Sequence, residues 1–270
     1  MNTQDKVLPK HRARKRFGQH FLTDQHIIDQ IISAVAPQKN EHLVEIGPGT
    51  GVLTRPLLAQ INSLDVIELD RDLAANLRRE FSPEILHVHE IDVLNFSFHS
   101  LVKGQEKIRL IGNLPYNIST PLIFLLLDES DVISDMTFML QKEVADRMTA
   151  EAGSKQYGRL SVMLQYQCDT EFLFDVPPES FDPPPKVMSS IIHLTPKAQP
   201  LHLKDKQLFD KLVKQAFSQR RKTLHNVLKD LVNDKELEAV GLSPKVRSDT
   251  ITMEEYVKLA NYLARNITGK

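Results

Sequence analysis

The chain has 270 residues, of which 41% are apolar and 26% charged, and its formal net charge is −1. This is ordinary globular composition, and the length suits one large domain plus a small one. The single cysteine, Cys168, excludes a disulfide framework and a cysteine-based zinc site, so we expect a reducing, cytoplasmic location and no metal. The longest apolar run, residues 122–127, is too short to cross a bilayer, and no hydrophobic signal peptide is apparent, so no membrane partner is expected.

The first feature in chain order is a basic segment near the N-terminus. Within residues 6–16 no acid occurs, and the cations are Lys6, Lys10, Arg12, Arg14, Lys15 and Arg16. Phosphate binding depends on such local patches more than on the net charge of a chain. We expect nucleic-acid contacts here, above all from the last four of these cations; a solvated disordered arm or a localisation signal is the alternative.

From residue 25 to about 195, short apolar segments alternate with segments of helical periodicity. Strands are predicted at 42–46, 64–69, 85–92, 108–113 and 133–140. Helices are predicted at 26–36, 51–61, 71–81 and 119–129. This alternation favours a mostly parallel sheet with helices on both faces. Two late strands, 172–176 and 187–194, are joined by a Pro-rich loop short enough for antiparallel pairing.

The alternation stops near residues 195–203, which have the composition of a linker. After it, the segments 206–217, 221–232 and 252–264 are all helical in pattern. We therefore divide the chain into three parts: a basic N-terminal arm at 1–23, an α/β domain at 24–198, and a small all-helical domain at 203–270.

The helical part carries a second basic group. A single helix over 208–231 would place Lys211, Lys214 and Arg221 on one polar face, but it would also place Arg220 among apolar residues. We therefore expect a break near Ser218, which could cap a second helix. We expect the following cations to contact nucleic acid, the alternative being a solvated basic face: Arg220, Arg221 and Lys222.

A glycine loop follows the first strand of the α/β domain. Gly47, Gly49 and Gly51 alternate with other residues directly after "VEI" and before a helix. Glycines allow a sharp turn and a close approach of the backbone to a ligand, and open parallel sheets bind ligands at this edge. The loop is a candidate binding site, although a purely structural turn would use the same residues.

Acids at the ends of the next two strands refine this interpretation. Glu68 could accept hydrogen bonds from ribose hydroxyls, and Asp92 could accept one from an adenine amino group. Each acid alone could be a cap or turn residue, but loop and acids together indicate an adenosine-bearing cofactor. The G-x-G-x-G spacing differs from the dinucleotide fingerprint and favours S-adenosylmethionine. The arrangement resembles the class I S-adenosylmethionine-dependent methyltransferases.

The fourth strand ends in Asn113-Leu114-Pro115-Tyr116. This sequence is similar to the Asn/Asp-x-Pro-aromatic motif of enzymes that methylate the amino groups of bases. The Asn113 side-chain oxygen and the Leu114 carbonyl could accept the two amino N–H groups, with Pro115 fixing the backbone between them. Tyr116 offers a flat face for stacking the base. An ordinary Asn-Pro turn is the alternative.

A second aromatic residue, Phe181, precedes three prolines that stiffen the following loop. Phe181 could cover the face of the base opposite Tyr116. A phenylalanine that anchors the loop in the core would give the same spacing.

With these motifs, the chain resembles the rRNA adenine dimethyltransferases, most closely the bacterial KsgA type, which modifies small-subunit rRNA. The likeness runs nearly end to end and includes "KRFGQHFLTD" at 15–24, "FDPPPKV" at 181–187 and "AFSQRRKTL" at 216–224. It implies a Rossmann-like methyltransferase sheet with one late antiparallel strand and a small helical domain. It also implies transfer of four methyl groups to two adjacent adenosines near the 3′ end of that rRNA, in an assembling 30S particle.

The resemblance assigns further residues. It implies that His20 and Leu22 line the methionine end of the cofactor with Gln19 beside them, that the glycine loop takes the cofactor backbone, and that Asn113 lies between cofactor and target. His20 departs from the family, which more commonly has Asn there, and its contact would depend on tautomer and pH. It could instead pack the N-terminal arm onto the domain.

Three other functions remain open at this point: a DNA adenine methyltransferase, a non-catalytic rRNA-binding assembly factor and a small-molecule methyltransferase. The first would usually need a larger sequence-reading domain, the second leaves the cofactor motifs without a use, and the third leaves the basic arm unexplained. We expect a monomer that recognises the shape of folded RNA and takes one unpaired or flipped base at a time.

Overall fold

The computed structural model describes residues 20–104 and 106–267, and the chain forms two compact units. One unit contains the residues up to Gln141 together with Phe174–Ile191. The other contains Lys142–Leu173 and the residues from Ile192 onward. The domain limits at 198 and 203 stay a prediction.

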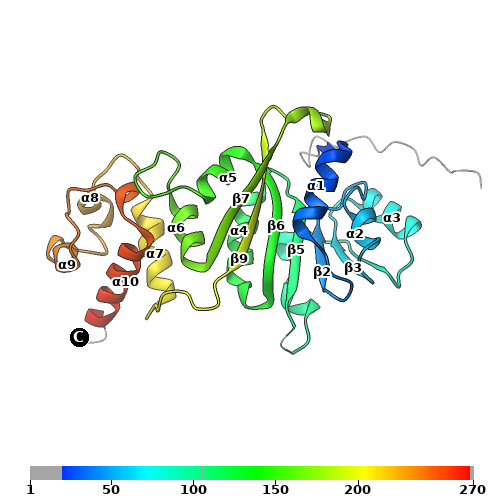
Figure 1. Ribbon diagram of the computed structural model, residues 1–270. Helices are drawn as coiled ribbons and strands as arrows, with labels where there is room; N and C mark the ends of the chain where they lie inside the picture. The colour runs from blue at the N-terminus through cyan, green and yellow to red at the C-terminus, as the bar shows by residue number, and fades with distance from the viewer. Residues whose placement is uncertain (1–19, 105, 268–270) are drawn as a thin grey trace, which may run out of the picture. The chain divides into compact units, whose positions relative to one another are not determined.

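A mostly parallel sheet organises the first unit (Figure 1). Five of its strands lie in this unit: β2 (Leu43–Ile46), β3 (Leu64–Ile67), β4 (Leu86–His89), β5 (Ile108–Asn113) and β6 (Ile133–Gln141). Two more, β7 (Cys168–Val176) and β9 (Ser189–Pro196), each have residues in both units. Their order is β4-β3-β2-β5-β6-β9-β7, and the first four pairings are parallel. The predicted fold class, including the late antiparallel strand, is confirmed.

The strand order reverses between β2 and β5. From β2 the chain moves outward through β3 to β4, then returns to the other side of β2 to form β5. At such a switch point the loops after the two neighbouring strands diverge and leave a crevice at their carboxyl ends. The glycine loop after β2 and the Asn113 motif after β5 therefore face the same crevice.

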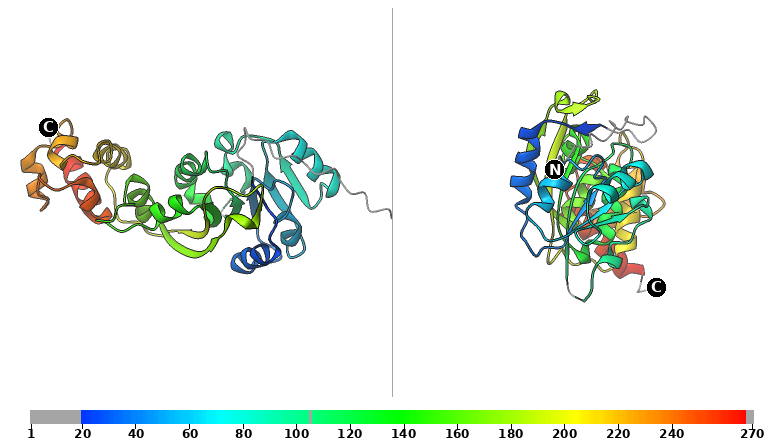
Figure 2. Two further views of the ribbon diagram at one scale, coloured as in Figure 1. Left: turned by 90° about the horizontal axis from the view of Figure 1, so that it is seen from above. Right: turned by 90° about the vertical axis from the view of Figure 1, so that its right-hand side faces the viewer.

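Helices cover both faces of these strands (Figure 2). They are α1 (Gln25–Val35), α2 (Thr54–Leu58), α3 (Arg71–Glu80) and α4 (Ser119–Asp128). Two begin at aspartates whose carboxylates accept backbone N–H groups: Asp24 caps α1 and Asp70 caps α3. The buried faces of α1 and α3 consist of residues such as Ile28, Ile31 and Leu77.

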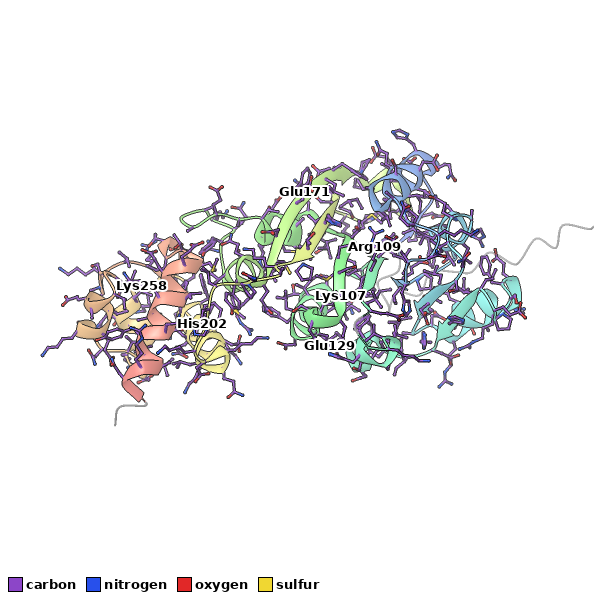
Figure 3. All side chains as sticks on the ribbon, turned by 60° about the horizontal axis from the view of Figure 1, so that its bottom comes forward. Lys107, Arg109, Glu129, Glu171, His202 and Lys258 are labelled. Carbon is purple, nitrogen blue, oxygen red and sulfur yellow. The ribbon has the colours of Figure 1, made fainter. Side chains whose placement is uncertain are left out.

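Arg109 fastens the middle of the sheet at the end away from the crevice (Figure 3). Its guanidinium donates to Asp135 at 2.8 Å, to Glu41 at 2.7 Å and to the Val35 carbonyl at 2.8 Å. The Arg109 side chain is 15% exposed, so these hydrogen bonds to charged groups are only partly screened by water. They join β5 to β6 and to the end of α1.

A short antiparallel pair that the sequence analysis did not predict ties the N-terminal segment to the Pro-rich loop. β1 (Phe21–Leu22) pairs with β8 (Phe181–Asp182). Next to it, the Thr23 N–H donates to the Ser180 carbonyl at 2.8 Å, and the Ser180 hydroxyl donates to Asp24 at 3.0 Å. The 3-10 helix Pro178–Ser180 leads into β8.

The second unit is mainly helical. It contains α5 (Lys142–Met148), α6 (Arg159–Gln167), α7 (Lys206–Ala216), α8 (Leu224–Leu228), α9 (Asp234–Ala239) and α10 (Met253–Ile267). Aromatic residues fill its core: Phe209 packs against Tyr166, and Phe217 packs against both Tyr157 and Tyr256. In the described part of the chain, no helix is long and apolar enough to cross a membrane.

The break expected within residues 208–231 is present, but the prediction that Ser218 caps the second helix was wrong. Helix α7 ends at Ala216 and α8 begins at Leu224. The Ser218 hydroxyl donates back to the Gln215 carbonyl at 2.7 Å, so it closes α7, while Thr223 occupies the position before α8. The seven-residue gap takes Arg220 out of the apolar face, which was the reason for expecting a break.

Candidate functional site

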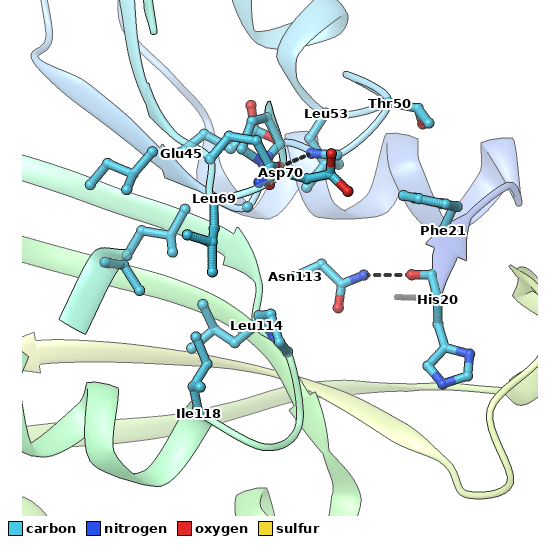
Figure 4. A pocket seen from close by; sticks show the side chains of 18 of the residues that line it. His20, Phe21, Glu45, Thr50, Leu53, Leu69, Asp70, Asn113, Leu114 and Ile118 are labelled. Atoms are coloured by element: carbon cyan, nitrogen blue, oxygen red, sulfur yellow. Dashed lines mark hydrogen bonds between the residues drawn. The ribbon is translucent and has the colours of Figure 1, made fainter. Parts of the chain in front are cut away.

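A cavity of about 380 Å³ lies at the carboxyl ends of β2, β3 and β5 (Figure 4). Ten of the predicted site residues line it: His20, Leu22, Gly47, Gly49, Glu68, Asp92, Asn113, Leu114, Pro115 and Tyr116. The fold thus brings the N-terminal motif, the glycine loop, both acids and the Asn113 motif to one place.

The glycine loop has a backbone conformation that is strained for residues other than glycine. Gly47, Gly49 and Gly51 have φ angles of +69°, +57° and +79°. A Cβ at Gly49 would lie 3.3 Å from the Phe21 ring, so glycine also leaves room for the N-terminal segment. Gly51 does not line the cavity; its N–H donates to the Pro48 carbonyl at 2.9 Å and closes the turn.

Glu68 follows β3 directly and is 7% exposed. One carboxylate oxygen accepts the Asp70 N–H at 2.8 Å and the other accepts the Gly49 N–H at 3.1 Å. Burial raises the pKa of Glu68, which these hydrogen bonds partly oppose. The carboxylate therefore holds the glycine loop against β3 and retains lone pairs for a ligand in the cavity.

Asp92 lies three residues beyond the end of β4. One of its oxygens accepts the Leu94 N–H at 3.0 Å and caps the 3-10 helix Val93–Asn95. The other oxygen accepts no hydrogen bond from the described residues. Asp92 is therefore a helix cap that also lines the cavity, and its contact with an adenine amino group stays a prediction.

Glu45 is a cavity residue that the sequence analysis missed. It lies in β2, is 2% exposed, and accepts a hydrogen bond from the Thr54 hydroxyl at 2.6 Å. Burial raises the pKa of Glu45 to about 7, with a further contribution from the negative charge of Glu68. Its position in a buried apolar strand immediately before the glycine loop could have identified it.

A Glu45→Gln variant is expected to change the pH dependence of stability. Because the pKa is raised from about 4.5 to about 7 on folding, the stability contributed by protonated Glu45 is full below about pH 4.5 and is lost as pH rises to about 7. Glutamine stays neutral, so the free energy of unfolding of the variant should rise relative to wild type across this range and level off above it. Urea denaturation of both proteins from about pH 5 to 8 measures this, and a constant difference would contradict it.

Asn113 is the last residue of β5, and its side chain has a fixed orientation. The amide nitrogen donates to the main-chain carbonyl of His20 at 3.2 Å (Figure 4). A carbonyl can only accept, so the nitrogen must face His20 and the amide oxygen must face the other way. The N-terminal segment thereby decides which polar atom Asn113 offers to the cavity.

The residues after Asn113 form a turn into α4. The Leu114 N–H donates to the Met139 carbonyl at 3.0 Å, whereas its own carbonyl accepts no hydrogen bond from the described residues. The Pro115 carbonyl accepts the Ile118 N–H at 3.1 Å. The Tyr116 hydroxyl shares a hydrogen bond of 2.8 Å with Ser189, and burial raises the pKa of Tyr116.

Phe181 is 4% exposed and is not among the residues that line the cavity. It pairs with Leu22 in the β1–β8 ladder, a position that favours the loop-anchoring alternative. Its proposed stacking on a base stays a prediction. Gln19 and the cations Arg12, Arg14, Lys15 and Arg16 lie outside the described residues.

In the second unit, the three adjacent cations after α7 are exposed but have different surroundings. Arg220 donates to the Lys155 carbonyl and lies 3.9 Å from Asp249, so part of its function is to hold neighbouring segments of its own unit. Arg221 and Lys222 form no ion pair with any described residue. Their side chains are therefore available to an anionic partner.

A family model described as ribosomal RNA adenine dimethylase matches residues 10–265. This match covers nearly the whole chain. The chain belongs to the ribosomal RNA adenine dimethylase family. The matched range includes the glycine loop, the Asn113 motif and the helices of the second unit up to residue 265.

Similar proteins support the same family. The ribosomal RNA small subunit methyltransferase A of Alcanivorax borkumensis is 52% identical over 255 residues, which are 94% of this chain and 91% of that protein. The protein of the same name from Dechloromonas aromatica is 53% identical, over 94% of this chain and 99% of that protein. Among solved structures, a dimethyladenosine transferase from Plasmodium falciparum is similar with a TM-score of 0.76 and 29% identity, over 89% of this chain and 96% of that one.

Proposed function

We propose that this protein transfers methyl groups from S-adenosylmethionine to the N6 amino groups of two adjacent adenosines near the 3′ end of small-subunit rRNA. The product is N6,N6-dimethyladenosine, made in the cytoplasm during assembly of the 30S subunit. Membership of the adenine dimethylase family and the names of the relatives support the substrate class.

The observation that carries the proposal is the orientation of Asn113. An adenine amino group is a poor nucleophile because its lone pair is delocalised into the ring. The Asn113 oxygen, turned away from His20, and the unengaged Leu114 carbonyl supply two acceptors on adjacent residues. Two such acceptors favour the pyramidal amino group, whose lone pair then points at the methyl donor, and no strong general base is needed.

The residues of the cavity fit S-adenosylmethionine. Glycines leave the loop backbone open to the cofactor, Glu68 suits the ribose hydroxyls, and Asp92 suits the adenine amino group. When bound, the cofactor supplies an electrophilic methyl group. Tyr116, which lines the same cavity as Asn113, stacks the target base in this proposal, and the base must be unpaired or flipped to reach it.

One assay separates this function from its rivals. Cofactor labelled in its methyl group is offered to small ribosomal subunits that lack the modification, to naked rRNA, to duplex DNA and to free adenosine. We expect label in ribosomal RNA, recovered as N6,N6-dimethyladenosine. Label only in DNA, only in adenosine or in none of the substrates would overturn the proposal.

We further propose that Arg221 and Lys222 bind RNA phosphates. Their replacement by glutamine is expected to weaken RNA binding and to reduce the magnitude of the slope of log K against log salt by about 1–2. The slope falls because binding releases fewer counterions when two phosphate contacts are lost. Filter binding at several salt concentrations measures the slope. The paired control is Lys235→Gln with Lys258→Gln, which removes the same charge from α9 and α10 of the same unit. An unchanged slope for the first pair, or an equal change for both pairs, would exclude the role.

A further inference from the structure

The His20 imidazole stacks on the Tyr116 ring. The two ring centroids are 5.8 Å apart and the ring planes are inclined by 27°. His20 was expected to face the methionine end of the cofactor, and Phe181 was expected to be the second ring near Tyr116. The structure places His20 in the aromatic contact and Phe181 in a buried strand pair, and His20 also lines the cavity, so both expected roles stay predictions.

Both rings are hydrogen-bonded to the segment that contains the Pro-rich loop and the start of β9. The His20 Nδ1 lies 2.7 Å from the Pro183 carbonyl, which can only accept, so Nδ1 is the donor. The Tyr116 hydroxyl shares its hydrogen bond with Ser189, the first residue of β9. Each ring is therefore held by a hydrogen bond, and both residues line the cavity.

This ring pair leaves no space for a base between its members. Stacked bases are spaced about 3.4 Å apart, so a base between two rings needs a centroid separation of about 7 Å. The observed separation of 5.8 Å falls short of this value. A base that stacks on the face of Tyr116 shared with His20 must first move the imidazole.

Moving the imidazole would not disturb Asn113. Asn113 is oriented by the main-chain carbonyl of His20, and β1 holds the main chain directly after that residue. The side chain is retained by one hydrogen bond and one stacking contact, each a modest interaction. It can leave Tyr116 while the rest of the site keeps its geometry.

We propose that His20 occupies the target-base position on Tyr116 in the RNA-free protein and is displaced when the adenine enters. This inference rests on the proposed function, in which Tyr116 stacks the target base. His20 is then a positioning residue that competes with the substrate. Only the fraction of protein with His20 displaced binds the base, and the apparent affinity for RNA is reduced by that fraction.

The test compares His20→Ala and His20→Asn with wild type in the full-length protein. We expect both variants to bind unmodified small subunits about three- to tenfold more tightly by filter binding without cofactor, and to lower the subunit KM by the same factor without raising kcat. His26→Ala is the matched control, because His26 is an exposed histidine of α1 that lines no part of the cavity. Thermal unfolding of each variant verifies that it folds.

A double-mutant cycle locates the effect. In a Tyr116→Leu background, His20→Ala should no longer change the dissociation constant, because the ring for which the imidazole and the base compete is absent. Unchanged or weaker subunit binding by both His20 variants would overturn the inference, and weaker binding would mean that the ring supports the base instead. The two proposals fail in different measurements. If the wild-type protein methylates no ribosomal RNA, the proposed function is refuted. The inference about His20 is tested by the ratio of variant to wild-type dissociation constants, which needs no turnover.

Discussion

Replacement of Asn113 by alanine is expected to reduce kcat for rRNA methylation by at least about 10²–10³-fold, while binding of S-adenosylmethionine largely survives. The loss is that of one preorganised acceptor at the amino group, an interaction that strengthens as the nitrogen becomes positive in the transition state. Single-turnover methylation and calorimetric titration with the cofactor separate the two effects. Near-normal turnover would refute the role of Asn113.

Asn113→Asp sharpens the same test. Aspartate keeps an acceptor at the position of the amide oxygen but cannot donate to the His20 carbonyl, so two oxygens would face each other at about the present 3.2 Å. We expect activity between those of wild type and Asn113→Ala. Asn62→Ala is the control. Asn62 lies on the exposed loop before β3 and does not line the cavity, so the loss of its amide should leave kcat unchanged.

Gly112→Ala is expected to lower the free energy of unfolding by about 1–3 kcal/mol and to reduce activity as well. Gly112 pairs with Ile46 across the β2–β5 ladder, and a Cβ there would lie 2.5 Å from the Ile46 carbonyl oxygen. The contact involves backbone, so the strands must separate or shift. Because Asn113 is the next residue, such a shift moves the Asn113 motif away from the glycine loop.

Urea denaturation and methylation assays measure the two consequences. Gly158→Ala is the matched control: a Cβ there would have no neighbour closer than 4.0 Å, and its φ is −166°. It should change stability less than Gly112→Ala. Equal stability of Gly112→Ala and wild type would show that the sheet absorbs the methyl group without strain.

The sequence predicted the sheet and many of the residues that line the cavity, because both depend on local patterns. Apolar segments of strand length alternating with helices specify parallel strands, and the glycines and acids at their ends fall at one edge by topology alone. Helix limits were less accurate: the helix expected at 221–232 is only Leu224–Leu228 in the structure. Its flanking residues instead form turns, which hydrophobic periodicity does not distinguish from helix.

The contacts of the N-terminal segment could not be predicted in this way. β1 and β8 are two residues each, too short for an alternating pattern, and their pairing joins distant parts of the chain. The same applies to the hydrogen bond between Asn113 and the His20 carbonyl, since a main-chain acceptor leaves no trace in residue identity. Glu45 was missed because it lies inside β2, whereas the predicted site residues were sought at strand ends, although a carboxylate in a buried apolar strand is itself unusual.

The fastening of the N-terminal segment also bears on the order in which parts of the site can form during synthesis. Thr23 and Ser180, whose hydrogen bonds hold this segment, are separated by 157 positions in the chain. A nascent chain therefore carries the glycine loop, Glu68 and Asn113 long before it carries the partner of β1. Contacts between such distant segments form late because the loop they close is long. Until β8 has been synthesised, the segment whose His20 carbonyl orients Asn113 lacks the strand partner that holds it.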